Sequence, residues 1–539
     1  MRFTPAVGYP FSAPVWLKPA GRFFGIAAEA PRSILPSPIG HLVLLSLLEL
    51  SVTQLTASAA IRNTLVILIG QFTGRLLDLL TILVIARHYG EEQYGQFSFA
   101  FAYVGYFAVL ADMGFGLIFV REMARSGDRA AALLSCMMVA KLVLVIISST
   151  LAAVFVLIPG YPEATVHLVW IALIGLMVSP KLPSVRTVYE QLFQSRLRMS
   201  VPVIIRLFEG LLLLLMVLIA TNYEQSMKVV VTLFVISFLP GLFGIYYLSR
   251  KLVIPSEWID FPLLRSLFKS ALPLGLLGAI WVMNGRIDVF FLSIWRTDSE
   301  IGYYSAAYRL TEAMRLLPSA VMMSVYPLLS QLARELPNSF SEILDTSVKV
   351  QLIIAIPVCF LLCVLAQPII AFLYTPAFLP AAGALSILVW TELAIVLTMS
   401  LSQTLIALNH RTVVIWISAG TLAVTICLNV FLIPTFGYLA ASGITVVSEM
   451  VGVVGYAVAV SRITGWSVLT PIFRVAPAAG GLVISWWAIQ SLDSTGAVFG
   501  GIAAYGAGLW FCKAITLQEA RIFLQSFPRL STARRNRNS

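Results

Sequence analysis

The sequence predicts an all-α polytopic membrane protein with about fourteen transmembrane helices. Of its 539 residues, 59% are hydrophobic and only 11% are charged, and the mean hydropathy is +0.91. Soluble domains are nearer 45–50% apolar and about 25% charged. Apolar runs long enough to cross a bilayer core, which takes about 20 residues, follow one another from residue 61 onward. A length that would suggest several soluble domains therefore indicates many membrane spans.

Residues 1–60 differ from the rest of the chain. Proline and glycine are scattered through them, and their one apolar stretch, residues 39–50, is too short to span a bilayer. A secretory signal places its apolar core within about the first 15–30 residues, so this stretch comes too late to be one. We expect a poorly ordered cytoplasmic extension over residues 1–60.

The apolar runs are separated by short polar breaks, and each run is an expected helix. Pro180, Lys181 and Pro183 interrupt the far end of the fourth run. Pro273, Pro318, Pro327, Pro357 and Pro368 lie inside later runs, where membrane bundles tolerate kinks. In chain order we expect helices over residues 65–86, 97–119, 131–158, 166–185, 201–221, 229–248, 268–295, 304–332, 350–374, 381–408, 413–434, 438–460, 472–490 and 497–511.

Basic residues in the connections alternate in number from one loop to the next. One alternate set of loops has few basic residues, namely Arg87, Lys228 and Arg296. Basic loop residues gather on the cytoplasmic side, so an even number of spans with both termini cytoplasmic fits the pattern. The other set of loops has many basic residues: Arg121, Arg125, Arg129, Lys181, Arg186, Arg196, Arg198, Arg250, Lys251, Arg265, Lys269, Arg334, Lys349, Arg411 and Arg462. The C-terminal tail adds Lys513, Arg521, Arg529, Arg534, Arg535 and Arg537. This placement accounts for the net charge of +11 through membrane topology, and we expect no nucleic-acid partner.

Two segments of the chain resemble each other. Residues 74–78 read Gly-Arg-Leu-Leu-Asp and residues 285–288 read Gly-Arg-Ile-Asp, and each segment is followed by Gly-x-aromatic-Ser-x-Ala, which begins at Gly95 and again at Gly302. Six helices separate the copies, so both enter the membrane in the same direction, as in a parallel repeat. We therefore expect an N-lobe of six helices (61–248), a cytoplasmic linker (249–267) and a C-lobe of six helices (268–460). A further helix pair (461–515) and a basic cytoplasmic tail (516–539) follow.

Thirteen charged residues lie at least five residues inside the ends of the expected spans. A charge near the middle of a span costs about 2.5–3.5 kcal/mol, so these side chains should face an interior or aqueous cavity. They concentrate on the first, second, seventh and eighth spans, which predicts a charged cleft between the lobes. The cations are Arg75, Lys141, Arg206, Arg286, Arg309 and Arg315, and the acids are Asp78, Asp112, Glu209, Asp288, Glu312, Glu392 and Glu449.

Some of these charges have opposite neighbours on their own helix face. Arg75 and Asp78 are three residues apart, as are Arg206 with Glu209 and Glu312 with Arg315. Such pairs can simply neutralise each other and join helices, which is the structural alternative to a binding role. Arg286 and Asp288 are two residues apart, so each should find its partner on another helix.

The chemistry of the charges favours an anionic amphiphile. Arginine binds phosphate and carboxylate through bidentate, charge-assisted hydrogen bonds, which makes the six cations candidate substrate-binding residues. Asp78, Asp288, Glu209, Glu312 and Glu449 are candidates to bind a coupling ion or to balance charge. The five cysteines and four histidines form no metal or disulfide framework. No phosphate-binding loop or nucleophile motif is present, so we expect neither a cofactor nor an enzyme.

Several motifs resemble one known family. Residues 86–98, which include Ala-Arg-His-Tyr-Gly and Tyr-Gly-Gln-Phe-Ser, and residues 112–116, Asp-Met-Gly-Phe-Gly, resemble the first two helices of bacterial polysaccharide-biosynthesis flippases. These flippases belong to the multidrug, oligosaccharidyl-lipid and polysaccharide exporter superfamily. Residues 288–292, 302–309 and 326–330 are similar to helices seven and eight of that family, and residues 428–437 to helix eleven. The likeness covers roughly residues 61–465, and residues 439–442 depart from the usual Gly-Ala-Ala run.

The resemblance implies alternating access between two lobes in the bacterial inner membrane, with undecaprenyl-diphosphate-linked oligosaccharide as the usual cargo. By position, Arg75, Arg286 and Arg309 would contact diphosphate or acidic sugar. Membrane lipids, a polysaccharide polymerase and other assembly proteins are the implied partners. The alternatives are a small-molecule or multidrug antiporter of the same superfamily and a membrane polysaccharide polymerase or ligase. The enzymes need a large outer loop, whereas the longest outer connection here runs over residues 87–96.

Overall fold

The computed structural model describes residues 38–125, 129–256, 258–335, 337–489 and 494–511. Its regular elements, over these ranges, are all helical, which confirms the predicted all-α class. The chain divides into two units, Met1–Arg62 and Asn63–Ser539, and the sites described below lie in the second. Helix α1 begins at Pro38, well before the expected first span, and residues 1–37 of the predicted N-terminal extension lie outside the described residues.

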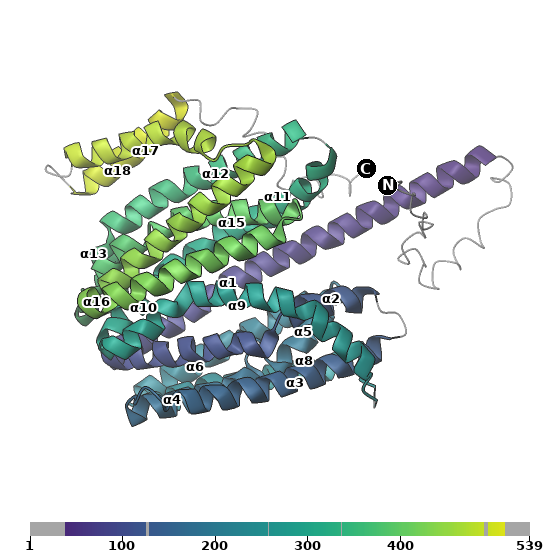
Figure 1. Cartoon of the computed structure of the whole chain (residues 1–539), viewed down its shortest axis with the longest axis horizontal. Helices are drawn as coiled ribbons and strands as arrows, with labels where there is room; N and C mark the ends of the chain where they lie inside the picture. Colours follow the sequence, from purple (N-terminus) through teal and green to yellow (C-terminus); the bar gives the residue numbers. More distant parts are fainter. Residues whose placement is uncertain (1–37, 126–128, 257, 336, 490–493, 512–539) are drawn as a thin grey trace, which may run out of the picture. The chain divides into compact units, whose positions relative to one another are not determined.

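The N-lobe is formed by α1 from Asn63 onward together with α2–α8 (Figure 1). Its helices end where the sequence offers breaks: α4 stops at Val178 before Pro180 and Pro183, and α8 carries Pro240 in its first turn. The bounds are α1 Pro38–Asp112, α2 Phe115–Arg125, α3 Ala130–Phe155, α4 Glu163–Val178, α5 Val185–Ser195, α6 Ser200–Asn222, α7 Met227–Ser237 and α8 Leu239–Ser249.

The C-lobe is formed by α9–α16, and α17 and α18 follow it. Pro273, Pro327 and Pro357 lie inside helices α9, α11 and α12, as the sequence predicted. The bounds are α9 Phe261–Trp295, α10 Asp298–Glu312, η2 Ala313–Arg315, α11 Leu316–Glu335, α12 Pro337–Val364, α13 Ala366–Leu373, η3 Pro376–Phe378, α14 Ala381–Leu388, α15 Thr391–Ala407, α16 Arg411–Thr464, α17 Leu469–Ile489 and α18 Ser494–Phe511.

Two of the longest helices are each two spans joined at a glycine. In α1 the backbone leaves the helical region at Gly90 (φ 75°, ψ −179°), and in α16 it does so at Gly437 (φ 61°, ψ −141°). A positive φ is readily adopted by glycine because it has no Cβ. The hydroxyl oxygens of Ser418 and Tyr456 lie 2.7 Å apart. In a straight helix, with a rise of 1.5 Å per residue, these residues would be about 57 Å apart. Helix α16 therefore folds back at Gly437.

The helices account for the fourteen expected spans. Nine stretches of the described helices are long and apolar enough to cross a membrane, and two of them, Ile69–Asp112 and Arg411–Thr464, contain the glycine turns and so supply two spans each. The apolar α4, the more highly charged α10–α11 and the terminal α18 match the three remaining runs. The chain is a multi-pass membrane protein.

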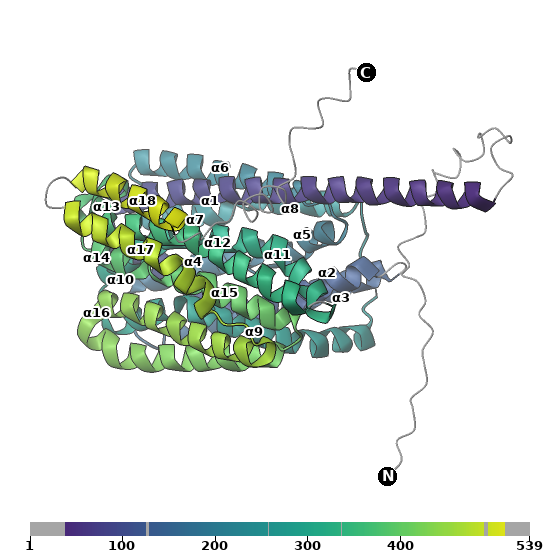
Figure 2. The same cartoon turned by 90° about the horizontal axis from the view of Figure 1, so that it is seen from above.

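Helix contacts group the spans as the internal repeat predicted. Helices α2–α8 contact one another, and α9–α16 contact one another, with α9 also touching α2 and α3 (Figure 1). Helices α17 and α18 lie side by side and pack on α12 (Figure 2). The small residues of this pair bring the backbones together: a Cβ on Gly508 would lie 2.8 Å from the Cα of Ala478. The exact residue limits of the predicted domains stay predictions.

Candidate functional site

A cavity of about 640 Å³ lies where the two lobes meet. Both halves of α1, the segment after α4, and α7, α9 and α10 contribute to its lining. Its apolar wall is supplied mainly by the N-lobe through Phe97, Phe101, Phe234 and Phe238. Its charged lining residues are Arg75, Asp78, Lys181, Arg286, Arg309 and Glu312. The predicted charged cleft between the lobes is therefore present.

Three arginines meet around Glu312 in this cavity. The Nη1 of Arg309 lies 3.2 Å from one carboxylate oxygen of Glu312, and the Nη2 of Arg286 lies 3.6 Å from the other. Arg75 donates from its Nη1 to the backbone carbonyl of Glu312 at 3.3 Å. We name Arg75, Arg286, Arg309 and Glu312 the arginine cluster. It joins α1 of the N-lobe to α9 and α10 of the C-lobe.

The end of α10 explains how Glu312 reaches this position. Helix α10 stops at Glu312, and a 3-10 turn, η2, separates it from α11. Because the α-helical ladder is interrupted there, the Glu312 carbonyl is free to accept from Arg75. The sequence predicted one continuous span over residues 304–332 and did not predict this break.

Asp78 pairs with Lys181 on the N-lobe side of the cavity. The Lys181 Nζ lies 2.5 Å from a carboxylate oxygen of Asp78. Lys181 follows the end of α4, and its backbone N–H donates to the hydroxyl of Ser179, which holds the segment between the two prolines. Arg75 was the expected local neighbour of Asp78, and that pairing is wrong. Lys181 was assigned to a cytoplasmic loop and not to the site.

The cavity departs from the two-fold repeat at two positions. With the repeat spacing of Gly95 and Gly302, Ser98 corresponds to Ser305, and both line the cavity. At the same spacing Ala102 corresponds to Arg309 and Gly105 to Glu312. The charged pair on α10 is thus absent from the matching helix of the N-lobe, although each lobe contributes two cations to the cavity: Arg75 and Lys181 from the N-lobe, and Arg286 and Arg309 from the C-lobe.

Two predicted site residues belong instead to a buried ion-pair network between α5 and α6. The fully buried Arg186 contacts Glu209 at 2.5 Å and Glu190 at 3.1 Å, and Arg206 pairs with the other oxygen of Glu190. Neither Arg206 nor Glu209 lines the cavity, and the expected local pair between them does not form. Four alternating charges in mutual contact lower the cost of burial, so this network holds α5 against α6.

Three further predicted residues also lie outside the cavity lining. Lys141 is completely buried on α3 and pairs with Asp112 at the end of α1. Arg315 contacts Glu392 on α15 at 3.2 Å, not its helix neighbour Glu312. Glu449 accepts a hydrogen bond from Thr398 at 3.3 Å. These contacts tie helices together within each lobe.

Asp288 is buried in the C-lobe behind the cavity wall, with 1% of its surface exposed. Its carboxylate accepts from the Tyr304 hydroxyl at 2.9 Å, the Thr445 hydroxyl at 3.0 Å and the Asn429 amide at 2.7 Å. The predicted partners on other helices are confirmed, because Tyr304 is on α10 and the other two are on α16. Arg286 likewise finds Glu312 on α10. Three neutral donors thus hold a carboxylate at the junction of α9, α10 and α16.

The lobes touch at the end that carries Gly90 and the start of α10, which we call the Gly90 end. A Cβ on Gly95 would lie 1.8 Å from the Asp298 carbonyl oxygen, and a Cβ on Gly302 would lie 2.2 Å from that of Glu91. With the repeat spacing, Glu91 corresponds to Asp298, so the two contacts are equivalent. Backbone touches backbone on both sides of the repeat axis.

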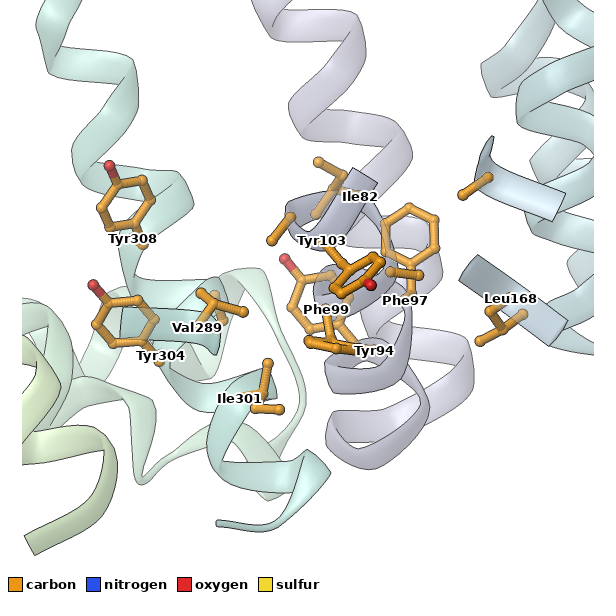
Figure 3. Close-up of a cluster of buried hydrophobic side chains, with 14 of the residues drawn as sticks. Ile82, Tyr94, Phe97, Phe99, Tyr103, Leu168, Val289, Ile301, Tyr304 and Tyr308 are labelled. Atoms are coloured by element: carbon orange, nitrogen blue, oxygen red, sulfur yellow. The ribbon is translucent and has the colours of Figure 1, made fainter. Parts of the chain in front are cut away.

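Side chains reinforce this closure. The Gln96 amide donates to Asp298 at 3.0 Å, and Arg87 donates to the terminal carbonyls of α13, with 2.7 Å to that of Leu373. Below them, Tyr94 and Phe99 of the N-lobe and Ile301 of the C-lobe belong to one buried cluster (Figure 3). The lining residues Phe72 and Leu76, by contrast, are 63% and 47% exposed. The lobes close the cavity at the Gly90 end. At the opposite end they also touch, because a Cβ on Gly275 of α9 would lie 2.4 Å from the backbone carbonyl carbon of Met113, and the exposed lining residues there are on α1.

Comparisons with known proteins agree with this architecture. The family described as "Polysaccharide biosynthesis protein" matches residues 60–333, just over half of the chain. A protein named as a probable low-salt glycan biosynthesis flippase of Haloferax volcanii is 25% identical over 40% of this chain and 43% of its own length. A second protein of that organism, named as a probable flippase, is 29% identical over 39% of this chain and 44% of its own length. The chain thus spans less than half of the length of these curated relatives.

Solved structures show the same fold. The lipid II flippase MurJ in an inward closed conformation has a TM-score of 0.65 and 16% identity, covering 85% of this chain and 98% of its own. An inward-facing multidrug transporter of the MATE family has a TM-score of 0.56 and 15% identity, covering 73% of this chain and 95% of its own. At these identities the likeness extends to the fold alone.

Proposed function

The chain belongs to the polysaccharide biosynthesis protein family, and on that premise we propose that it is a flippase that moves a lipid-linked oligosaccharide across the membrane. The observation that supports this most is the arginine cluster at the meeting of the two lobes. Guanidinium groups bind phosphate through paired hydrogen bonds, so three of them around one cavity suit a diphosphate. The protein would move its cargo without breaking a bond, and so it would not be an enzyme.

The shape of the cavity suits an amphiphile. Arg286 and Arg309 would hold the anionic diphosphate, while the phenylalanine wall opposite them favours apolar surface. Lys141, Arg206 and Arg315 would act as helix-joining residues rather than ligand contacts. By the family resemblance the carrier lipid is undecaprenyl diphosphate, and the membrane is the bacterial cytoplasmic membrane with both termini inside.

Alternating access would come from rocking of the lobes. In the arrangement described, the lobes meet at the Gly90 end, and the exposed Phe72 on α1 would mark the entry to the cavity at the opposite end. The loop charges assign the Phe72 end to the cytoplasm. Loading from the inner leaflet, separation of the Gly90 end and closure of the Phe72 end would then release cargo outward.

Among the acids, Asp288 is our candidate for the coupling group. All three hydrogen-bond donors to its carboxylate are neutral groups. A bound proton or cation would therefore supply the positive charge that compensates the carboxylate. Asp78, Glu209 and Glu312 face cations and would balance charge. Glu449 is held by Thr398 close to the C-lobe ion pairs and would do the same.

The multidrug antiporter is the second candidate, because an inward-facing multidrug transporter shares the fold. A small hydrophobic cation needs acids and aromatic rings around it. Here four cations, Arg75, Lys181, Arg286 and Arg309, face two acids in the cavity, which favours an anionic cargo.

The test is reconstitution of the full chain in liposomes with a fluorescent lipid-linked oligosaccharide. Arg286→Ala and Arg309→Ala should abolish most translocation, because each removes a guanidinium from the cavity. Arg462→Ala is the matched control, since this exposed arginine lies at the end of α16 outside the cavity. Translocation that both cavity variants leave unchanged, or wild-type efflux of organic cations without lipid movement, would refute the proposal.

A further inference from the structure

Glu312 occupies the place where an anionic ligand would bind. Its two carboxylate oxygens face Arg309 at 3.2 Å and Arg286 at 3.6 Å, and its carbonyl accepts from Arg75. The charge of Arg315 also acts on this carboxylate. About a third of the side chain, 32%, is exposed to the cavity, so the carboxylate is accessible from the space that a ligand would enter.

The ion pairs around Glu312 are loose enough to exchange. At 3.2 Å and 3.6 Å the contacts are longer than the 2.7–2.9 Å of a well-formed charge-assisted hydrogen bond, and neither arginine is held in bidentate fashion. Arg186, by contrast, makes two contacts with Glu209, at 2.5 Å and 2.8 Å, and is fully buried. Arg286 and Arg309 thus each contact the Glu312 carboxylate through one terminal nitrogen while they line the cavity.

The charges of the cluster do not cancel. Arg75, Arg286 and Arg309 carry three positive charges against the one negative charge of Glu312, which leaves an excess of two. The neighbouring Asp78 is neutralised by Lys181, and Arg315 is neutralised by Glu392. A diphosphate esterified at both ends carries two negative charges at neutral pH, whereas a phosphate diester carries one.

We propose that Glu312 is an internal counter-anion that the diphosphate of the cargo displaces, and that its negative charge limits how tightly the cavity holds diphosphate and single-phosphate lipids. This inference rests on the proposed flippase function. With Glu312 in place, a diphosphate cancels the excess charge of the cluster, and a single phosphate leaves one charge uncompensated in a low-dielectric site. Glu312 also supplies the anion that replaces the departing diphosphate, so release does not leave three arginines facing one another.

The position is specific to the C-lobe. The matching residue of the N-lobe is Gly105, and a Cβ placed there would meet nothing within 4 Å. Gly105 also lines the cavity, so the open space beside it would leave room for the ligand. Displacement of Glu312 would thus need a side-chain rotation and no movement of the lobes.

The experiment compares Glu312→Gln with the wild type in lipid nanodiscs. The probes are a polyprenyl diphosphosugar and a polyprenyl phosphosugar, which carry two and one negative charges, each competing with a fluorescent polyprenyl diphosphosugar. The wild type should prefer the diphosphate, and Glu312→Gln should bind both lipids more tightly, with the preference raised about tenfold, because the removed negative charge repels a ligand with two negative charges more than a ligand with one. Glu312→Asp keeps the charge and should keep the preference. Glu312→Ala, which removes the charge without placing an amide in the cluster, provides a second test if the Gln variant folds poorly.

Asp78→Asn is the matched control for net charge. It also removes a carboxylate from the cavity lining, but from beside Lys181 and not from the arginine cluster. If it raises the preference as far as Glu312→Gln does, or if the Glu312 charge-removal variants keep the wild-type preference, the inference is wrong while the flippase proposal stands. If the wild type binds neither lipid, the flippase proposal fails and the inference falls with it.

Discussion

The contact between Gly95 and Gly302 makes the closure of the Gly90 end sensitive to one added methyl group. In Gly95→Ala the new Cβ would lie 1.8 Å from the Asp298 carbonyl oxygen, and ordinary contact begins at 3.4 Å, so the helices must separate locally by about 1.6 Å. In Gly302→Ala the distance is 2.2 Å to the Glu91 carbonyl oxygen. Both obstacles are backbone atoms, which cannot rotate away as a side chain can.

The cost of such overpacking is about 1–3 kcal/mol, and it falls only on the state in which the lobes touch. The ratio of closed to open Gly90 ends should therefore decrease by about 5- to 150-fold in either single variant. The double variant should cost less than the sum of the two, because the first separation already relieves part of the second contact.

Spin labels at His88 and Thr297 would measure this shift, since both side chains are exposed at the Gly90 end and lie on different lobes. Each alanine variant should move the distance distribution toward longer values. Gly278→Ala is the control, because a Cβ there meets nothing within 4 Å. Distributions for Gly95→Ala and Gly302→Ala that overlay the wild type would show that this backbone contact does not set the closed state.

Three other substitutions test the remaining contacts. Arg186→Ala should lower the stability of the detergent-solubilised protein by about 3–5 kcal/mol, because it leaves Glu209 buried beside Glu190 without their shared cation; an unchanged thermal midpoint would contradict this. Arg87→Ala should loosen the Gly90 end by about 0.5–1.5 kcal/mol through loss of the bonds to the α13 carbonyls, which the same spin labels would report as a longer mean distance. Asp288→Asn should fold normally and make lipid translocation insensitive to an imposed proton or sodium gradient; a retained gradient dependence would remove Asp288 as the coupling group.

Most helices could be located from the sequence because an apolar run is a local property, although α1 and α12 begin well before their expected spans. The breaks inside spans could not. One break separates α7, which ends at Ser237, from α8, which begins at Leu239 in the same apolar run. Another is η2, which interrupts the eighth span where Glu312 and Arg315 form their ion pairs. Helix α5 was also missed. Its charges suggested a loop, yet Arg186 is fully buried because its partner Glu209 arrives from another helix.

The charged residues of the site were predictable and their pairing was not. Local spacing favoured pairs three residues apart, but Asp78 pairs with Lys181 across 103 positions of the chain and Arg315 pairs with Glu392 across 77. In a low-dielectric interior the carboxylate takes the nearest cation in space, and helix packing decides which cation that is. Where spacing excluded a local partner, as for Asp288, the expectation of a partner on another helix was correct.

Closure of the lobes depends on positions that are equivalent in the two copies of the repeat, whereas lipid recognition depends on positions that differ between them. At the Gly90 end the lobes are equivalent: Gly95 and Gly302, at matching positions, each meet the backbone of the other lobe, so one small residue per lobe permits a closure symmetric about the repeat axis. In the cavity the equivalence is lost, because Arg309 and Glu312 stand where the N-lobe has Ala102 and Gly105.

Substitutions at the symmetric positions should therefore change the populations of the two states with little effect on which lipid binds. Substitutions at the asymmetric positions should change lipid preference with little effect on the populations, because an ion pair open to the cavity carries little of the lobe contact. A substitution at Gly302 that altered the diphosphate preference as strongly as one at Glu312 would show that closure and recognition are a single property of the fold.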